Sequence, residues 1–233
     1  SLMASVENGS IHSIIFTSGT TGHPRGVQLT YTNHFASATA SAYRLGVLPS
    51  DRWLLCMPLW HVGGLAIVLR TCIYGIALVI MEHGFHVSVL RDILEEECVT
   101  LVSLVPTMLH RLINLPNQDN PPDSLRCVLL GGDAASKTLL SQALTSRWPI
   151  AVTYGLTEAS AQVATASPTL TSRKPGCAGK PLVGVGMQIC SPTGDQLPAN
   201  KTGEIVVSGS TLMHGYCGQP EATHKVMRNS RLY

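Results

Sequence analysis

A run of ten residues near the start of the chain has the composition needed to hold a polyphosphate. Residues 17–26 read Thr-Ser-Gly-Thr-Thr-Gly-His-Pro-Arg-Gly and directly follow the apolar run 11–16. The glycines let backbone N–H groups approach a ligand closely, the hydroxyls can donate hydrogen bonds, and the guanidinium of Arg25 can neutralise charge. A Walker A loop is excluded, because Gly22 is not followed by Lys and a hydroxyl residue. The sequence therefore predicts a nucleotide-phosphate loop of another type, with a Gly/Thr-rich surface turn as the alternative.

The elements that must position this loop alternate between strands and helices. We predict strands at 11–16, 53–56, 76–80, 100–104, 127–130 and 150–153, and helices near 33–45, 63–73, 87–97, 106–114 and 136–146. The strands are almost continuously apolar, which predicts an α/β fold with a mostly parallel or mixed sheet and helices on both faces. Ligands of such sheets bind beyond the carboxyl ends of the strands. We therefore expect the glycine pair 131–132 and residues 154–158, which follow two of these strands, to lie in one cleft.

The character of the chain changes at the Pro/Gly-rich segment 174–181. Short strands at 187–190 and 204–208, joined by a turn at 191–195, are expected after it. We therefore predict an α/β subdomain over residues 1–175 and a small β-rich subdomain over residues 176–233.

Composition excludes several classes of partner. The chain has 233 residues, 45% hydrophobic and 13% charged, with a net charge of +2 and scattered Lys and Arg, which argues against a nucleic-acid partner. Seven cysteines without a Cys-x-x-Cys pair argue against a zinc site or a complete disulfide framework, and fit a cytoplasmic location. The apolar stretch 62–81 contains Arg70 and is interrupted at 74–75, which argues against a membrane span. The low charge predicts apolar surface patches and self-association into homo-oligomers.

Three ordered motifs carry a resemblance to a known family. Residues 17–26 resemble the first signature of the adenylate-forming superfamily, Thr-Ser-Gly-Thr-Thr-Gly-x-Pro-Lys-Gly, with Arg25 in place of the usual Lys. Residues 154–158, Tyr-Gly-Leu-Thr-Glu, resemble the second signature, and 203–207 with 215–216 resemble the third. The superfamily contains acyl-CoA synthetases, luciferase-like enzymes and the adenylation domains of peptide synthetases. The resemblance implies a piece of the large N-terminal domain without the C-terminal lid domain, which we expect to be close to inactive by itself.

The resemblance also implies ATP and Mg²⁺ as ligands and CoA as a co-substrate. It assigns Tyr154 to the adenine face, Thr157 to phosphate oxygens and Glu158 to Mg²⁺, and these side chains suit those partners. A substrate carboxylate would attack the α-phosphorus and form an acyl adenylate as pyrophosphate departs, helped by positioning and electrostatic stabilisation. By itself, Glu158 would be interpreted as a helix-start carboxylate. The predicted catalytic residues are His61, Thr157 and Glu158, and the predicted ATP-binding residues are Thr17, Ser18, Gly19, Thr20, Thr21, Gly22, Arg25, Tyr154, Gly155 and Thr157.

Two side chains, His61 and Arg70, give information about the acyl substrate. Residues 58–64, Pro-Leu-Trp-His-Val-Gly-Gly, resemble the aromatic-His element that flanks the acyl pocket in this family, so His61 is either a gate or an ordinary core histidine. Segment 57–66 lacks the carboxylate that holds the ammonium in amino-acid adenylation domains, which disfavours an amino-acid substrate. Arg70 lies in an apolar predicted helix, and it pairs either with an internal carboxylate or with a carboxylate of the substrate.

Together with residues 53–62, 103–107 and 128–132, this pattern is most similar to the 2-succinylbenzoate–CoA ligases of menaquinone or phylloquinone biosynthesis. Their substrate has two carboxylates, of which one is activated, and the other would need a cation or polar donors. The alternatives are an aryl or medium-chain acyl-CoA ligase, a non-catalytic nucleotide-binding fragment, and a structural or interaction protein. The predicted substrate-binding residues are His61, Arg70, Ser103, Gly131 and Gly132.

Overall fold

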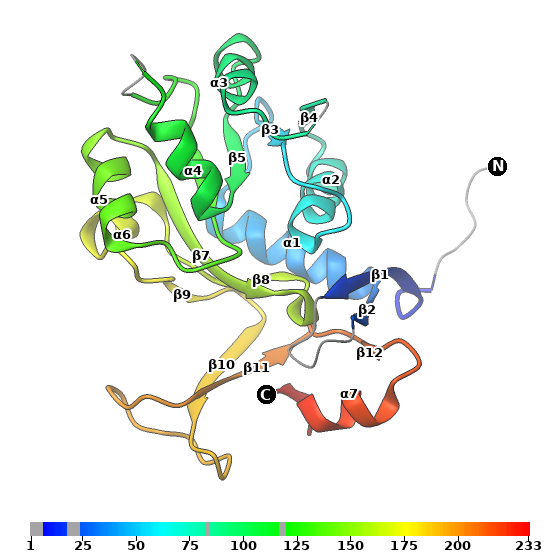
Figure 1. Ribbon diagram of the computed structural model, residues 1–233. Helices are drawn as coiled ribbons and strands as arrows, with labels where there is room; N and C mark the ends of the chain where they lie inside the picture. Colours follow the sequence, from blue (N-terminus) through cyan, green and yellow to red (C-terminus); the bar gives the residue numbers. More distant parts are fainter. Residues whose placement is uncertain (1–6, 18–23, 83, 117–119) are drawn as a thin grey trace, which may run out of the picture.

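A seven-stranded sheet forms the centre of the molecule (Figure 1). The computed structural model describes residues 7–17, 24–82, 84–116 and 120–233. The strand order is β4-β3-β5-β6-β7-β8-β9, with parallel pairing from β4 to β7 and antiparallel pairing of β8 with both of its neighbours. This confirms the predicted mixed, mostly parallel sheet. The strands are β3 (Arg52–Leu55), β4 (Ala77–Ile80), β5 (Leu101–Leu104), β6 (Cys127–Leu130), β7 (Ile150–Leu156), β8 (Ala161–Thr165) and β9 (Lys180–Pro181).

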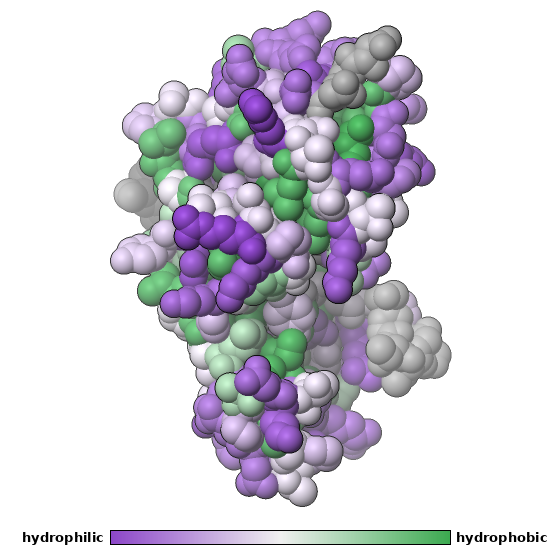
Figure 2. Space-filling view, turned by 90° about the vertical axis from the view of Figure 1, so that its left-hand side faces the viewer, coloured by the Kyte–Doolittle hydropathy of each residue, from purple (hydrophilic) through white to green (hydrophobic). Residues whose placement is uncertain are grey.

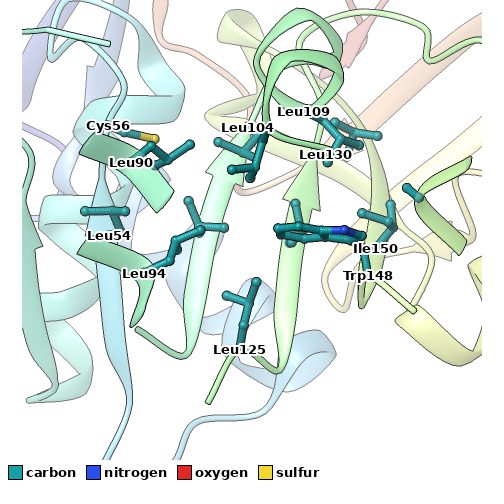
Figure 3. Packing of buried hydrophobic residues seen from close by; sticks show 14 of the residues in the cluster. Leu54, Cys56, Leu90, Leu94, Leu104, Leu109, Leu125, Leu130, Trp148 and Ile150 are labelled. Atoms are coloured by element: carbon teal, nitrogen blue, oxygen red, sulfur yellow. The ribbon is translucent and has the colours of Figure 1, made fainter. Parts of the chain in front are cut away.

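Side-chain alternation along the parallel strands divides the core into two faces, because successive residues of a strand point to opposite sides. One face packs against α3 (Val87–Glu96), α4 (Pro106–Ile113) and α5 (Lys137–Thr145). Figure 3 shows strand and helix residues meeting in this cluster: Leu54, Leu104, Leu130, Leu90, Leu94 and Leu109.

The opposite face of the sheet carries Trp53, Leu101 and Leu129, which pack with Ile67 of α2 (Val62–Tyr74). Helix α1 (Tyr31–Leu45) packs against α2 in turn. Both faces of the sheet are therefore covered by helices, as the apolar strands predict.

Two smaller sheets complete the fold. In the first, β2 lies between β1 and β12, and in the second the strand order is β10-β11-β14-β13. The four-stranded sheet follows the Pro/Gly-rich segment and extends away from the large sheet in Figure 1. Strand β9, which lies after residue 175, nevertheless joins the large sheet. The predicted division into two subdomains at residues 175–176 stays a prediction. The elements are β1 (Ile11–Thr17), β2 (Arg25–Thr30), α6 (Pro168–Arg173), β10 (Val185–Cys190), β11 (Glu204–Gly209), β12 (Gly215–Tyr216), α7 (Pro220–Val226), β13 (Met227–Arg228) and β14 (Arg231–Leu232).

The end of β7 differs from the prediction. Residues 154–156 were expected to form a loop after the strand, but they continue β7 because they pair with β8, which the sequence pattern did not predict. The short 3-10 turn Thr157–Ala159 then carries Glu158. Strand β2 was also missed, since it interrupts its apolar pattern with Gly26 and Gln28 and is stabilised by pairing with β1.

The surface carries exposed apolar side chains, including Phe16, Tyr43 and Trp60. On the face drawn in Figure 2, hydrophobic residues form several separate areas between hydrophilic ones. None of the helices in the described part of the chain combines the length and the apolar character that crossing a bilayer requires. Self-association through the apolar areas stays a prediction.

A buried histidine in α1 makes the fold acid-sensitive. His34 is 7% exposed and its Nε2 lies 2.8 Å from the Ser13 hydroxyl. Burial, followed by the nearby His12 and Arg70, lowers the pKa of His34 from its usual 6.5 to about 4. The unfolded chain therefore binds a proton at this site at a higher pH than the folded chain does, and stability is lost as the pH falls from 6.5 towards 4.

We expect the free energy of unfolding to fall by about 2–3 kcal/mol between pH 7.5 and pH 4.5 through His34. Urea unfolding at the two pH values measures this loss, and His34→Gln should remove most of it because glutamine does not titrate. His110→Gln, at an exposed position on α4, is the matched control and should keep the full pH dependence. An equal pH dependence in the wild type and His34→Gln would contradict this assignment.

Candidate active site

A cavity of about 750 Å³ lies beyond the carboxyl ends of β3, β5, β6 and β7. This is the place where ligands bind in open parallel sheets. Residues 18–23, which include the predicted ATP-binding residues 18–22, lie outside the described part of the chain. The flanking residues of that loop and most other predicted site residues line the cavity: Thr17, Arg25, His61, Arg70, Ser103, Gly131, Gly132, Gly155, Thr157 and Glu158.

Of the predicted site residues that the structure describes, Tyr154 alone does not line the cavity. Its ring packs against the hydrophobic cluster that contains Ile15 and Val27, while Thr153 and Gly155 on either side of it line the cavity. Burial and the charge of Glu158 raise the pKa of Tyr154. Its assignment to the adenine face stays a prediction.

Tyr216 is a cavity residue that the sequence reasoning left out of the site. Its hydroxyl donates a hydrogen bond to Oε1 of Glu158 over 2.8 Å, and the Arg25 guanidinium carbon lies 5.3 Å from the centre of its ring. Burial and the Glu158 carboxylate raise the pKa of Tyr216 to about 12, so the phenol is a protonated donor at neutral pH. The available signal was its place in the third signature, at residues 215–216.

The turn that carries Glu158 is held in a strained conformation. The two residues that close it, Ser160 and Ala161, have φ angles of 54° and 88°, a region that costs non-glycine residues about 1–3 kcal/mol each. Hydrogen bonds maintain the turn: Ser37 Oγ donates to the Ser160 carbonyl over 2.6 Å, and Ser160 Oγ donates to the Thr211 carbonyl over 2.7 Å. The backbone carbonyl of Glu158 accepts from the Met213 N–H over 2.8 Å. Glu158 is therefore presented by a turn whose backbone is tied to α1 and to the segment before β12.

The donors at this end of the cavity fit a magnesium ion brought in by a nucleotide. Across the described residues there is no group of three or more His, Cys, Asp or Glu that could hold a metal by protein ligands alone. Mg²⁺ is commonly held by one or two carboxylates together with substrate phosphates. Glu158 offers that carboxylate, and its Oε2 accepts no hydrogen bond from the part of the chain that the structure describes.

Arg70 is the buried cation of the cavity. It is 3% exposed, its Nη2 donates to Ser37 Oγ over 3.4 Å, and its guanidinium carbon lies 5.6 Å from the Trp53 ring centre. Burial lowers the pKa of Arg70. Within the described ranges no carboxylate lies at ion-pair distance from Arg70, which removes the support for an internal ion pair. A buried charge without a counterion is costly, so this position favours an anionic ligand.

Ser103 shares a face of the sheet with Trp53, whose indole N–H donates to the Ser103 hydroxyl over 3.2 Å. Since Trp53 also lies beside Arg70, one indole positions both predicted substrate-binding groups. His61 is exposed and directly precedes α2 at the cavity. The interpretation of His61 as an ordinary core histidine is therefore wrong, and its role as a gate stays a prediction.

The glycine pair after β6 allows a close approach to neighbouring strands. A Cβ atom on Gly131 would lie 2.6 Å from Cγ2 of Thr153, and Gly132 has a φ of 84° with Val105 3.0 Å from the position of an added Cβ. Packing against Thr153 therefore disfavours a side chain at Gly131, and the positive φ disfavours one at Gly132. The flat backbone surface that they leave suits an aromatic ring or an acyl chain.

Comparisons with known proteins agree with this arrangement. A 2-succinylbenzoate–CoA ligase from Bacillus mycoides (strain KBAB4) is 40% identical over 221 residues, which are 95% of this chain and 46% of that protein. The o-succinylbenzoate CoA synthetase of Bacillus subtilis, solved with ATP and a magnesium ion, has a TM-score of 0.91 at 37% identity and covers 97% of this chain and 47% of its own. In complex with its acyl-adenylate intermediate OSB-AMP it has a TM-score of 0.92, at 37% identity, with 97% and 46% covered.

A third similar protein comes from Mycobacterium tuberculosis. The N-terminal domain of FACL13 from Mycobacterium tuberculosis, bound to an inhibitor, has a TM-score of 0.88 at 27% identity and covers 98% of this chain and 58% of its own. The chain therefore has the fold of the N-terminal domain and spans about half the length of the curated relatives it matches. The AMP-binding enzyme family matches residues 3–217. Since that match covers most of the chain and the cavity gathers residues from all three signatures, this chain belongs to the AMP-binding enzyme family.

Proposed function

We propose that the protein containing this chain is an ATP-dependent acyl-CoA ligase that activates 2-succinylbenzoate through an acyl adenylate, in menaquinone or phylloquinone biosynthesis. The observation that carries the choice of substrate is the buried guanidinium of Arg70, which lines the cavity without a carboxylate partner among the described residues. A dicarboxylic acid would supply that partner with the carboxylate that does not react. The names of the relatives from Bacillus mycoides and Bacillus subtilis support the same substrate.

The two ends of the cavity would bind different substrates, the acid at one end and the nucleotide at the other. Arg70 and Ser103 would hold the non-reacting carboxylate, and the glycine pair 131–132 would accept the aromatic ring. At the other end, Arg25 would neutralise charge on the nucleotide, and the Thr157 hydroxyl would donate to its phosphate oxygens. The phosphate role of residues 18–22 is part of this proposal, supported by the position of Thr17 and Arg25 at the cavity.

Glu158 would hold the magnesium ion of the nucleotide, and bound magnesium supplies shielding of the charge that develops on the phosphates. The reacting carboxylate of the acid would then be oriented towards the α-phosphorus by the contacts at its far end. CoA would be the co-substrate whose thiol attacks the acyl carbon of the adenylate, forming the thioester and releasing AMP. Because the relatives are about twice as long, we expect the 233-residue piece by itself to be close to inactive.

Pyrophosphate release by the full-length protein tests the function. We expect 2-succinylbenzoate to give the highest kcat/KM in a panel that also contains benzoate and medium-chain fatty acids, with thioester formation once CoA is added. Preference for one of the monocarboxylic acids would replace the proposal by an aryl or medium-chain acyl-CoA ligase. Binding of ATP without pyrophosphate release for any acid would favour a non-catalytic nucleotide-binding protein.

A further inference from the structure

Tyr216 joins two oppositely charged side chains at the nucleotide end of the cavity. Its hydroxyl donates to Glu158 over 2.8 Å, and its ring lies under the Arg25 guanidinium at 5.3 Å. Glu158 is 58 residues away along the chain, and Arg25 comes from the strand β2 that pairs with β12. One phenol therefore contacts both groups that would face the phosphates and their cation.

The backbone of Tyr216 is held in place independently of these contacts. Its N–H donates to Thr223 Oγ1 over 2.8 Å, and Thr223 in turn donates to the Gln219 carbonyl over 3.0 Å. Tyr216 also pairs with Val27 in the β2–β12 ladder. Tyr216 is 6% exposed and belongs to a hydrophobic cluster, so packing determines the position from which its hydroxyl reaches Glu158.

A tyrosine is well suited to position a carboxylate that must also bind a cation. A neutral phenol restricts the rotamer of Glu158 without supplying a positive charge, so the carboxylate keeps its attraction for a metal ion. Because the hydrogen bond occupies Oε1, the second carboxylate oxygen is left for a cation. A lysine or arginine at the same place would instead compete with the cation.

We propose that Tyr216 is a positioning residue that sets the magnesium affinity of the nucleotide complex through Glu158, and that its ring separately holds Arg25 for the nucleotide phosphates. The proposal rests on the proposed function only in taking MgATP as the ligand of this end of the cavity. It makes two distinguishable claims. The hydroxyl acts on the response to Mg²⁺, whereas the ring acts on nucleotide affinity even when Mg²⁺ is removed.

Two variants of the full-length protein separate the hydroxyl from the ring. Tyr216→Phe keeps the ring above which Arg25 lies and removes the hydroxyl, with its hydrogen bond to Glu158 and its side-chain interaction with Arg25. Tyr216→Leu removes the aromatic ring as well. ATP binding is measured by titration calorimetry with EDTA and with a series of Mg²⁺ concentrations, and pyrophosphate release is measured over the same series. Tyr43→Phe, at a tyrosine that is 84% exposed on α1, is the matched control for removing a phenol hydroxyl.

For Tyr216→Phe we expect the half-saturating Mg²⁺ concentration to rise about tenfold and kcat to recover at saturating Mg²⁺. The ATP affinity in EDTA should fall less than in Tyr216→Leu, because the ring contact to Arg25 remains. For Tyr216→Leu we expect an additional loss of about threefold or more in ATP affinity in EDTA, because the cation–π contact is removed. Tyr43→Phe should match the wild type. The calorimetric arm needs no acyl substrate, so it tests Tyr216 even if the identity of the acid is wrong.

Several results would overturn the proposal. An unchanged Mg²⁺ response in Tyr216→Phe would remove the positioning role, and so would an equal loss of kcat at every Mg²⁺ concentration accompanied by a lower melting temperature. Wild-type ATP binding that does not respond to Mg²⁺ would also contradict it. If Tyr216→Leu fails to fold, the conservative phenylalanine variant still decides the claim about the hydroxyl.

Discussion

Replacement of Arg70 by methionine in the full-length protein will raise the KM for 2-succinylbenzoate by about two orders of magnitude or more. Removing one member of a buried, charge-assisted contact costs on the order of 2–5 kcal/mol, and each 1.4 kcal/mol is a factor of ten. Benzoate and other monocarboxylic acids lack the group that Arg70 would hold, so their kcat/KM should be no lower than in the wild type. Initial rates of pyrophosphate release with the two acids measure the difference.

The same substitution should lower activity towards 2-succinylbenzoate without lowering the stability of the fold. In the absence of substrate Arg70 is 3% exposed without a carboxylate partner in the described ranges, and methionine fills a similar volume without the cost of a buried charge. We therefore expect the melting temperature of Arg70→Met to equal or exceed that of the wild type. Arg111→Met, at an exposed position on α4, is the matched control. It should change neither the KM for 2-succinylbenzoate nor the melting temperature. Equal loss of activity towards both acids, or a clear loss of stability, would show that Arg70 is structural and would leave the acyl substrate open.

Replacement of Gly155 by alanine will destabilise the fold by about 4 kcal/mol or prevent folding. A Cβ atom at this position would lie 1.6 Å from the carbonyl oxygen of Ala161 and 2.6 Å from its carbon, and both are backbone atoms of the paired strand. Side-chain rotation cannot relieve such a contact, so the β7–β8 pairing would have to separate. The register of this pairing already shifts between Tyr154 and Gly155.

Urea unfolding followed by circular dichroism measures the effect of Gly155→Ala. Gly9→Ala is the matched control, because a Cβ at Gly9 meets nothing within 4 Å, and we expect it to change the free energy of unfolding by less than about 0.5 kcal/mol. A free energy of unfolding for Gly155→Ala within about 1 kcal/mol of the wild type would mean that β7 and β8 can move apart locally at little cost. The loss of folding in Gly155→Ala would also remove nucleotide binding, since the turn that carries Glu158 follows directly.

Much of the architecture was predictable because its signals act within a few residues. Apolar runs predicted all five parallel strands to within one residue at their starts, and the helical stripe over 87–97 predicted α3. The rule that ligands bind at the carboxyl ends of parallel strands placed Gly131 and Thr157 in one cavity. The charge and burial of Arg70 also followed from the sequence, since a single guanidinium in an apolar helix has few other places to lie.

The contacts that give the site its geometry were decided by the tertiary structure. The hydrogen bond from Tyr216 to Glu158, and the one from Ser37 to the strained turn at Ser160, join residues far apart in the chain and leave no local pattern. The packing of Tyr154 into the hydrophobic cluster depends on β8, whose pairing extends β7 by three residues beyond the predicted end. Periodicity and turn chemistry report on a residue and its close neighbours, whereas the direction of a side chain depends on strands and helices that meet only after folding. The sequence therefore determined which residue types surround the cavity, and long-range pairing decided which of them touch.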